Sequence, residues 1–151
     1  MVIQKATKLL LIRLGSIAVV LSAGIFLSGC GGSEGLQTVQ GKVLLTDGKP
    51  LTKGAVRFVP DKDKGNKSTD EPIGEISADG SYSLQTAGKK GAAPGWYKVS
   101  VTSAEIPDSS KPNAVTSYVA PKFNNPDTSM LSVEVVASPG ADAYNLKVSA
   151  K

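Results

Sequence analysis

The sequence contains no histidine and only one cysteine, Cys30. Histidine is the most common general base and metal ligand near neutral pH, so its absence excludes Ser-His-Asp and Cys-His catalysis. A single cysteine cannot form a disulfide within the chain. Together, these absences predict a protein with no catalytic residues, no bound metal and no cofactor.

Aromatic residues are also few, with one Trp, four Tyr and three Phe. Val, Leu, Ile and Ala must therefore supply most of any hydrophobic core. Glycine and proline, 16 and 9 residues, are spread along the chain. This distribution favours many short strands joined by turns over long helices.

Residues 30–151 have no large excess of positive or negative charge. The net charge is +4, but the first 29 residues contain Lys5, Lys8 and Arg13 and no acidic residue. The rest of the chain is therefore nearly neutral. A nucleic-acid-binding domain needs a basic field, so we expect no nucleic-acid partner.

The N-terminus has three successive zones. The basic residues named above precede an uncharged run, Leu14 to Phe26, which is followed by Leu27-Ser28-Gly29-Cys30. This is the layout of a secretory signal. The uncharged run is shorter than the roughly 20 residues that span a bilayer. We therefore predict that residues 1–29 are a signal peptide.

The tetrad Leu27-Ser28-Gly29-Cys30 resembles the lipobox of bacterial lipoproteins, in which Leu, a small residue and Gly or Ala precede Cys. The resemblance implies a diacylglyceryl group on Cys30, cleavage before Cys30, and a new amine that can be acylated. Two or three acyl chains exceed the single chain that binds membranes only marginally. Residues 30–36 would then form a Gly-rich tether. By analogy with lipoprotein sorting, Gly31 in place of Asp favours the outer membrane of a Gram-negative host.

Two other interpretations of this segment remain open. A stretch beginning near Leu9 could stay uncleaved as a signal anchor if Arg13 extended to the interface. Alternatively, Cys30 could be a buried structural residue. A signal peptide and an anchor would both take the domain out of the cytoplasm, so we expect it in the cell envelope, facing the periplasm or the exterior.

From residue 37 onward, apolar residues alternate and turn signals recur every ten to fifteen residues, as in short strands. We predict strands at Thr38–Leu45, Ala55–Val59, Ile73–Ser77, Ser81–Thr86, Gly95–Ser103, near Val115–Val119, Leu131–Val136 and Tyr144–Ser149. We expect solvated loops at Asp61–Glu71 and Ala87–Pro94, a long loop at Glu105–Thr128, and no helix after Cys30. Seven or eight strands in residues 37–151 indicate an antiparallel β-sandwich.

The order of these signals is similar to that of a known family. GKVLLTDGKPLTKGAVRFVP (Gly41–Pro60), GEISADGSYSLQT (Gly74–Thr86) and GAAPGWYKVSV (Gly91–Val101) resemble the carboxypeptidase regulatory-like, or transthyretin-like, domain. PKFNNPDTSMLSVEV (Pro121–Val135) is similar to the tail of small planctomycete lipoproteins of this type. The resemblance covers most of residues 37–149 and implies a seven- to eight-stranded, Ig-like sandwich. The residues themselves predict that Tyr82, Leu84, Tyr97 and Val99 face inward.

No enzyme activity follows from this resemblance. Hydroxyisourate hydrolases on the transthyretin-like fold use histidines and a Tyr-Arg-Gly-Ser type ending, both absent here. Metallo-carboxypeptidases carry such a domain only beside a catalytic domain, which this chain lacks. Asp61 to Asn66 is similar in composition to a calcium loop, but Pro72 stands where the bidentate Glu belongs.

Trp96 is the residue we single out as a possible binding surface. Because Tyr97 is expected to point inward, Trp96 should lie on the outer face or near the loop Gly88–Pro94. There it could stack on a sugar or anchor a partner, or it could simply cover a strand edge. A second possible surface is a basic patch made of Lys49, Lys53, Lys89, Lys90 and Lys98, although an ordinary solvated surface also explains these lysines.

Two functions remain. The first is a non-catalytic, lipid-anchored structural or protein-interaction module of the cell envelope. The second is a glycan- or small-molecule-binding lipoprotein that uses Trp96 and the adjacent loops. Both place the membrane, through the N-terminal lipid, among the partners.

Overall fold

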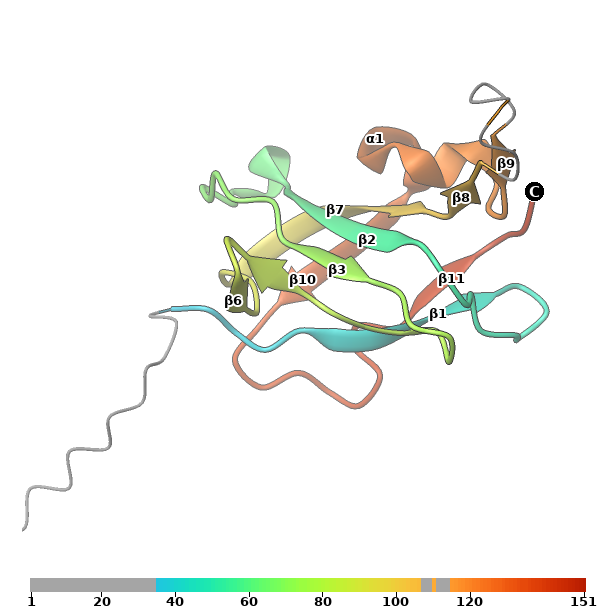
Figure 1. Cartoon of the computed structure of the whole chain (residues 1–151). Coiled ribbons are helices and arrows are strands. Elements are labelled where there is room, and N and C mark those ends of the chain that lie inside the picture. Colours follow the sequence, from blue (N-terminus) through green and yellow to red (C-terminus); the bar gives the residue numbers. More distant parts are fainter. Residues whose placement is uncertain (1–34, 107–109, 111–114) are drawn as a thin grey trace, which may run out of the picture. The chain divides into compact units, whose positions relative to one another are not determined.

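The computed structural model describes residues 35–106, 110 and 115–151. These residues belong to one compact unit, residues 31–151, and Figure 1 shows it as a β-rich domain. The predicted signal peptide, the lipobox and Cys30 lie outside the described residues. In the described part, no helix has the length and apolar character required to cross a bilayer.

The larger sheet has six strands in the order β10-β7-β2-β3-β5-β6. Their bounds are β2 Ala55–Pro60, β3 Ile73–Glu75, β5 Gln85–Thr86, β6 Lys89–Lys90, β7 Gly95–Thr102 and β10 Leu131–Val135. The long central strand β7 pairs antiparallel with β2 on one side and with β10 on the other. This strand was the clearest in the sequence because its apolar and polar residues alternate over its whole length.

The smaller sheet has three strands in the order β11-β1-β4, with β1 Gln40–Leu45, β4 Ser81–Ser83 and β11 Leu146–Val148. The pair β1–β4 is antiparallel, but β1 and β11 run parallel, with Val43 opposite Leu146. The prediction of a wholly antiparallel sandwich is therefore wrong at this pair. The residue pattern of a strand does not reveal the direction of its neighbour.

One hydrophobic core fills the space between the two sheets. Apolar residues of β1, β4 and β11 pack in the same cluster as those of β2, β7 and β10. Phe58 and Tyr97 are fully buried at its centre, with ring centroids 5.6 Å apart. The inward orientation predicted for Tyr82, Leu84 and Val99 is confirmed, since all three are buried. The chain is thus an all-β sandwich, as its periodicity predicts.

The structure adds short elements that the sequence pattern did not predict. A third sheet pairs β8, Ala104–Glu105, with β9, Thr116–Ser117. The strand expected near Val115–Val119 is confirmed as β9, but β8 was not predicted: it follows the strand expected to end at Ser103 and includes Glu105, the first residue of the expected long loop. The expected loop Ala87–Pro94 likewise contains β6, which forms a hairpin with β5.

The prediction that no helix follows Cys30 is wrong. Within the described residues there are three single-turn helices: η1 Lys62–Lys64, η2 Pro121–Asn124 and α1 Pro126–Ser129. Proline opens both η2 and α1, and the Asn125 side chain accepts the backbone N–H of Asp127 to cap α1. Proline at the first position and Asn at the cap favour helix initiation. These helices are too short to produce the apolar periodicity on which the prediction relied.

The predicted hairpin at residues 73–86 forms, but its second arm divides between the two sheets. β4 pairs with β1 in the smaller sheet, whereas β5 pairs with β3 in the larger sheet. The predicted turn at Asp79-Gly80 is confirmed, because Gly80 has φ +81° and the Asp79 side chain accepts the Ser81 N–H at 3.0 Å. Residues 81–86 therefore join the two sheets at one corner of the sandwich.

Candidate functional site

Along the sequence, the described fold begins only a few residues after the predicted lipidation residue. The first backbone pairing of the described chain joins Gln37 to Ala92, by two N–H···O bonds of 2.8 and 2.9 Å. Gly91 permits this approach, because a Cβ there would lie 2.4 Å from the Gln37 carbonyl oxygen. Gln37 is seven positions after Cys30.

Trp96, the predicted surface residue, is the second residue of β7 and is partly buried. Its backbone carbonyl accepts the Asp61 N–H at 2.9 Å and the Asn66 side-chain N–H at 2.8 Å. Trp96 lines a shallow hollow together with Ala93, Pro94 and Gly95. It therefore lies near the end of the loop Gly88–Pro94, as predicted.

The loop beside Trp96 is more ordered than the sequence indicates. Asp61 and Asn66 are only 4% and 6% exposed, so the prediction of a fully solvated loop from residue 61 to 71 is wrong for these two residues. Asp61 caps η1 by accepting the Asp63 N–H, and Asn66 accepts the Ser68 N–H at 2.9 Å. The burial of both polar side chains is possible because their polar atoms have partners.

Lys64 covers one face of the Trp96 ring. Its Nζ lies 3.9 Å from the ring centroid and also donates a hydrogen bond of 2.8 Å to Ser132 Oγ. An ammonium over an indole face is a favourable cation–π geometry. The Trp96 ring can therefore stack on a ligand through this face only after Lys64 moves.

Replacing Lys64 by alanine should expose this face of Trp96. We expect the free energy of unfolding to fall by about 0.5 to 1 kcal/mol, the size of an exposed cation–π contact, and the Trp96 emission to shift to longer wavelength. The control is Lys67→Ala, which removes an exposed lysine of the same loop. Equal spectra for the two variants would show that Lys64 does not cover the ring.

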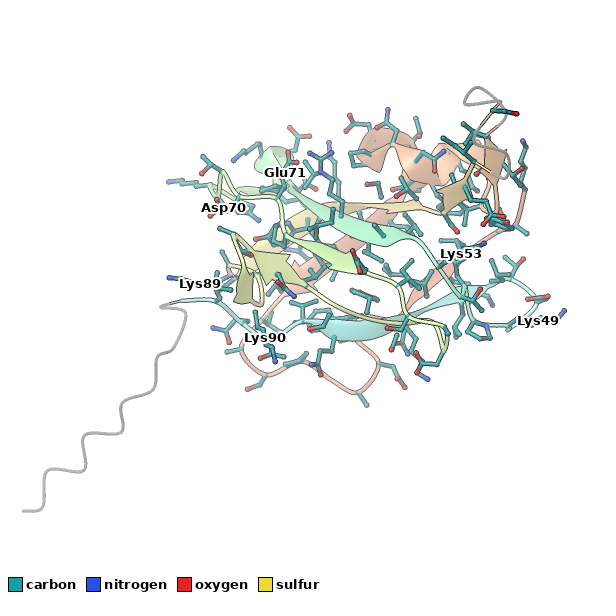
Figure 2. The ribbon with its side chains drawn as sticks, in the orientation of Figure 1. Lys49, Lys53, Asp70, Glu71, Lys89 and Lys90 are labelled. Atoms are coloured by element: carbon teal, nitrogen blue, oxygen red, sulfur yellow. The ribbon has the colours of Figure 1, made fainter. Side chains whose placement is uncertain are left out.

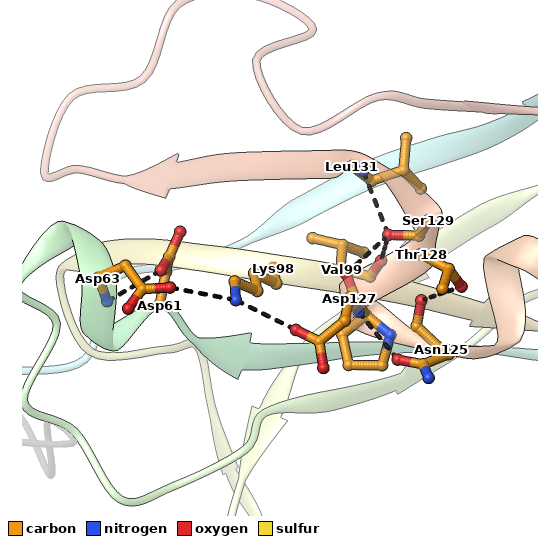
Figure 3. Close-up of polar contacts among 10 residues, drawn as sticks. Asp61, Asp63, Lys98, Val99, Asn125, Asp127, Thr128, Ser129 and Leu131 are labelled. Carbon is orange, nitrogen blue, oxygen red and sulfur yellow. Dashed lines mark hydrogen bonds and ion pairs between the residues drawn. The ribbon is translucent and has the colours of Figure 1, made fainter.

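A second polar cluster ties the loops to β7, as Figure 3 shows. Lys98 Nζ lies 3.1 Å from Asp127 Oδ1 and 3.4 Å from Asp63 Oδ2, so this lysine joins α1 to η1. The hydrogen bond with Asp127, reinforced by Asp63, raises the pKa of Lys98 above its ordinary value. Ser129 Oγ donates to the Val99 carbonyl and accepts the Leu131 N–H, which fixes α1 against the sheet.

The five lysines considered above as a basic patch are dispersed. Figure 2 shows Lys49 and Lys53 at the opposite end of the domain from Lys89 and Lys90. Lys49 is paired with Asp47 at 3.2 Å, and Lys53 is paired with Glu105. With Lys98 also bound to two carboxylates, the five lysines do not form one basic surface.

The hydroxyl groups of two buried tyrosines are engaged in structural contacts. The Tyr82 hydroxyl donates to the Tyr144 carbonyl at 2.6 Å, and burial raises the pKa of Tyr82. Burial likewise raises the pKa of Tyr97, whose hydroxyl donates to Ala93. No group of three metal-binding side chains occurs among the residues that the structure describes. Residues 31–35 have the G-x-S-x-G spacing found around the nucleophilic serine of some hydrolases, but almost all of this segment lies outside the described residues. The chain also has no histidine to activate that serine.

One hollow of the described domain was not predicted. It is a groove of about 890 Å³ on the outer surface of β1, β3 and β4, and Trp96 is not among its lining residues. The outward-facing residues of these strands are mainly hydroxyl, amide and charged side chains, which sequence analysis treats as ordinary solvated positions. Only the pairing of strands distant in the sequence brings them together.

Comparison with known proteins leaves the family of this chain open. The resemblances given above therefore depend on the quoted motifs alone, and the fold depends on the observed strands. No family model, no curated protein and no solved structure matches the chain.

Proposed function

We propose that this protein is a lipoprotein of the bacterial cell envelope. A diacylglyceryl group on Cys30 would anchor it, and residues 37–151 would act as a non-catalytic module that engages a neighbouring envelope component. The observation that carries the proposal is the tetrad Leu27-Ser28-Gly29-Cys30, placed between a basic, then apolar leader and a β-domain. Because the first backbone pair of that domain is at Gln37, the sandwich would lie close to the lipid surface.

We also propose the transthyretin-like type of sandwich for this domain. Its support is the position of the quoted motifs on the strands. The first motif spans β1 and β2, the second contains the hairpin from β3 to β5, and the third includes β7. Gly54, which lies in the first motif, has φ +128° where the chain enters β2, a conformation that glycine readily adopts.

A module that acts through its surface fits the described side chains better than an enzyme does. The chain has no histidine, and its buried tyrosines hold backbone carbonyl groups. Every buried side-chain polar atom of the described residues has a hydrogen-bond partner. The domain therefore offers a rigid scaffold whose unengaged polar groups are on the outside.

Mass spectrometry of the protein from bacterial membranes tests the anchor directly. We expect a mature N-terminal peptide that begins at Cys30 and carries the mass of a diacylglyceryl group, with or without a third acyl chain. Chemical cross-linking in the same membranes should then yield one recurring envelope partner. A product that retains Met1 would contradict cleavage, and an unmodified Cys30 in the mature peptide would contradict lipidation.

A further inference from the structure

The outer groove is built where the two sheets are joined. The strand from Ser81 to Thr86 pairs first with β1 and then with β3, so side chains of both sheets reach one hollow. At Gly74 a Cβ would lie 2.6 Å from the Ser83 carbonyl oxygen, so the absence of a side chain allows β3 and β4 to approach closely. Most wall residues are therefore held on strands, and Ser77, Asp142 and Asn145 are the exceptions.

Five polar side chains of this groove have no hydrogen-bond partner within the described domain. They are Gln40, Glu75, Ser77, Ser83 and Gln85. Two other wall residues are already fixed: Asn145 accepts the Lys42 N–H at 2.8 Å and donates to Asp142 Oδ1 at 2.8 Å. The groove thus combines positioned polar groups with several donors and acceptors that are free for a ligand.

The charges of the groove disfavour an anionic ligand. Its wall contains the carboxylates of Glu75 and Asp142, and the ammonium of Lys42 lies 3.5 Å from Asp79 Oδ2. No uncompensated cation remains in the wall to bind a phosphate or carboxylate group. Amide, hydroxyl and carboxylate side chains are instead suited to the paired donor and acceptor groups of sugar hydroxyls.

The groove also has an apolar part, and most of its strand backbone is already paired. Ile73 is 51% exposed and lines the wall, as does Ala55, so the groove has apolar surface that can contact the face of a sugar ring. β1 lies between β11 and β4, and β3 lies between β2 and β5. β4 is the end strand of the smaller sheet, but its Tyr82 is bridged to Ile76 on the open side. The groove therefore offers a peptide only a short edge for β-augmentation.

We propose that this groove is a binding site for a neutral glycan. The amides of Gln40 and Gln85 and the carboxylate of Glu75 hydrogen-bond sugar hydroxyls, while Ile73 contacts the apolar face of a ring. A volume of about 890 Å³ falls within the range of roughly 300 to 1,000 Å³ typical of ligand sites. The proposal does not depend on lipidation, and it places the ligand away from Trp96.

Calorimetric titration of the purified full chain with neutral oligosaccharides tests this site. The probes are malto-, cello-, xylo-, manno- and chito-oligosaccharides of five or six units. The chain is kept in micelles of a detergent without a sugar headgroup, so that the detergent does not compete. We expect saturable binding of at least one probe. Because each lost hydrogen bond weakens binding by about fivefold, Gln40→Ala combined with Gln85→Ala should weaken it by about 25-fold.

Matched variants locate the binding. Glu75→Gln should weaken it, whereas Glu134→Gln, which changes an exposed carboxylate on β10 outside the groove, should not. Trp96→Phe should leave binding unchanged. Thermal unfolding of each variant checks that the domain remains folded. Absence of saturable binding to every probe, unchanged binding by the double variant, or loss of binding in Trp96→Phe would each overturn the proposal.

Discussion

Replacing Cys30 by serine should move the protein from the membrane fraction to the soluble fraction. The serine hydroxyl has the size of the thiol but lacks the nucleophilic sulfur that takes the diacylglyceryl group. Each buried methylene of an acyl chain contributes about 0.8 kcal/mol to membrane binding. Losing two or three chains therefore removes far more binding energy than the domain surface could replace. Flotation of membranes on a density gradient, followed by immunodetection, measures the shift.

A matched control separates lipidation from general export. Ser28→Ala keeps a small residue in the lipobox pattern, so this variant should float with the membranes as the parent chain does. Radiolabelled palmitate should label the parent and Ser28→Ala but not Cys30→Ser. If Cys30→Ser floated with the membranes as before, an uncleaved signal anchor would replace lipid as the explanation of attachment.

Replacing Gly54 by alanine should destabilise the domain by on the order of 3 to 5 kcal/mol. Two effects add at this position: φ is +128°, which strains any residue with a Cβ, and that Cβ would lie 2.1 Å from the Thr102 carbonyl oxygen. Thr102 belongs to the central strand β7, so the clash cannot be relieved at a free loop end. Since small domains are stable by only about 5 to 15 kcal/mol, this is a large fraction of the total.

Gly48 provides the control, because it lies in the same β1–β2 connection. It has φ +86°, and a Cβ there would meet no atom within 4 Å. Gly48→Ala should therefore cost only about 1 kcal/mol, from backbone strain alone. Chemical unfolding followed by the fluorescence of Trp96, the single tryptophan, measures both values. A similar cost for the two variants would mean that the close approach at Gly54 is not maintained in solution.

Alternation along the chain was sufficient to predict the sandwich and much of its core. Tyr97 and Val99 could be placed inside because β7 keeps a strict period of two, and burying one face of a strand fixes its register. The Asp79-Gly80 turn was equally readable, since φ > 0 there requires glycine. These features depend on residues that are neighbours in the sequence.

The remaining features depend on residues that are far apart in the sequence. Asn66 has the sequence context of a solvent-facing loop residue, and its side-chain partner, the Trp96 carbonyl, comes from a strand 30 residues away. The outer groove has the same origin, because β1, β3 and β4 each contribute polar residues that look ordinary alone. The capping signals at Asn125 and Pro126 were present in the sequence, but a helix of four residues leaves no periodic pattern.

The parallel pairing of β1 with β11 has a consequence for biosynthesis. The first and last strands of the described domain are neighbours. Val43 lies opposite Leu146, although the two residues are separated by almost the whole sequence of the domain. Contacts between such distant residues delay folding, because the long connecting segment must be ordered first. A nascent chain released only as far as β10 has β4 beside β1 but still lacks the other neighbour of β1, which is β11. The chain must therefore be released through β11 before the domain can complete its fold. Until then it stays accessible to proteases and chaperones.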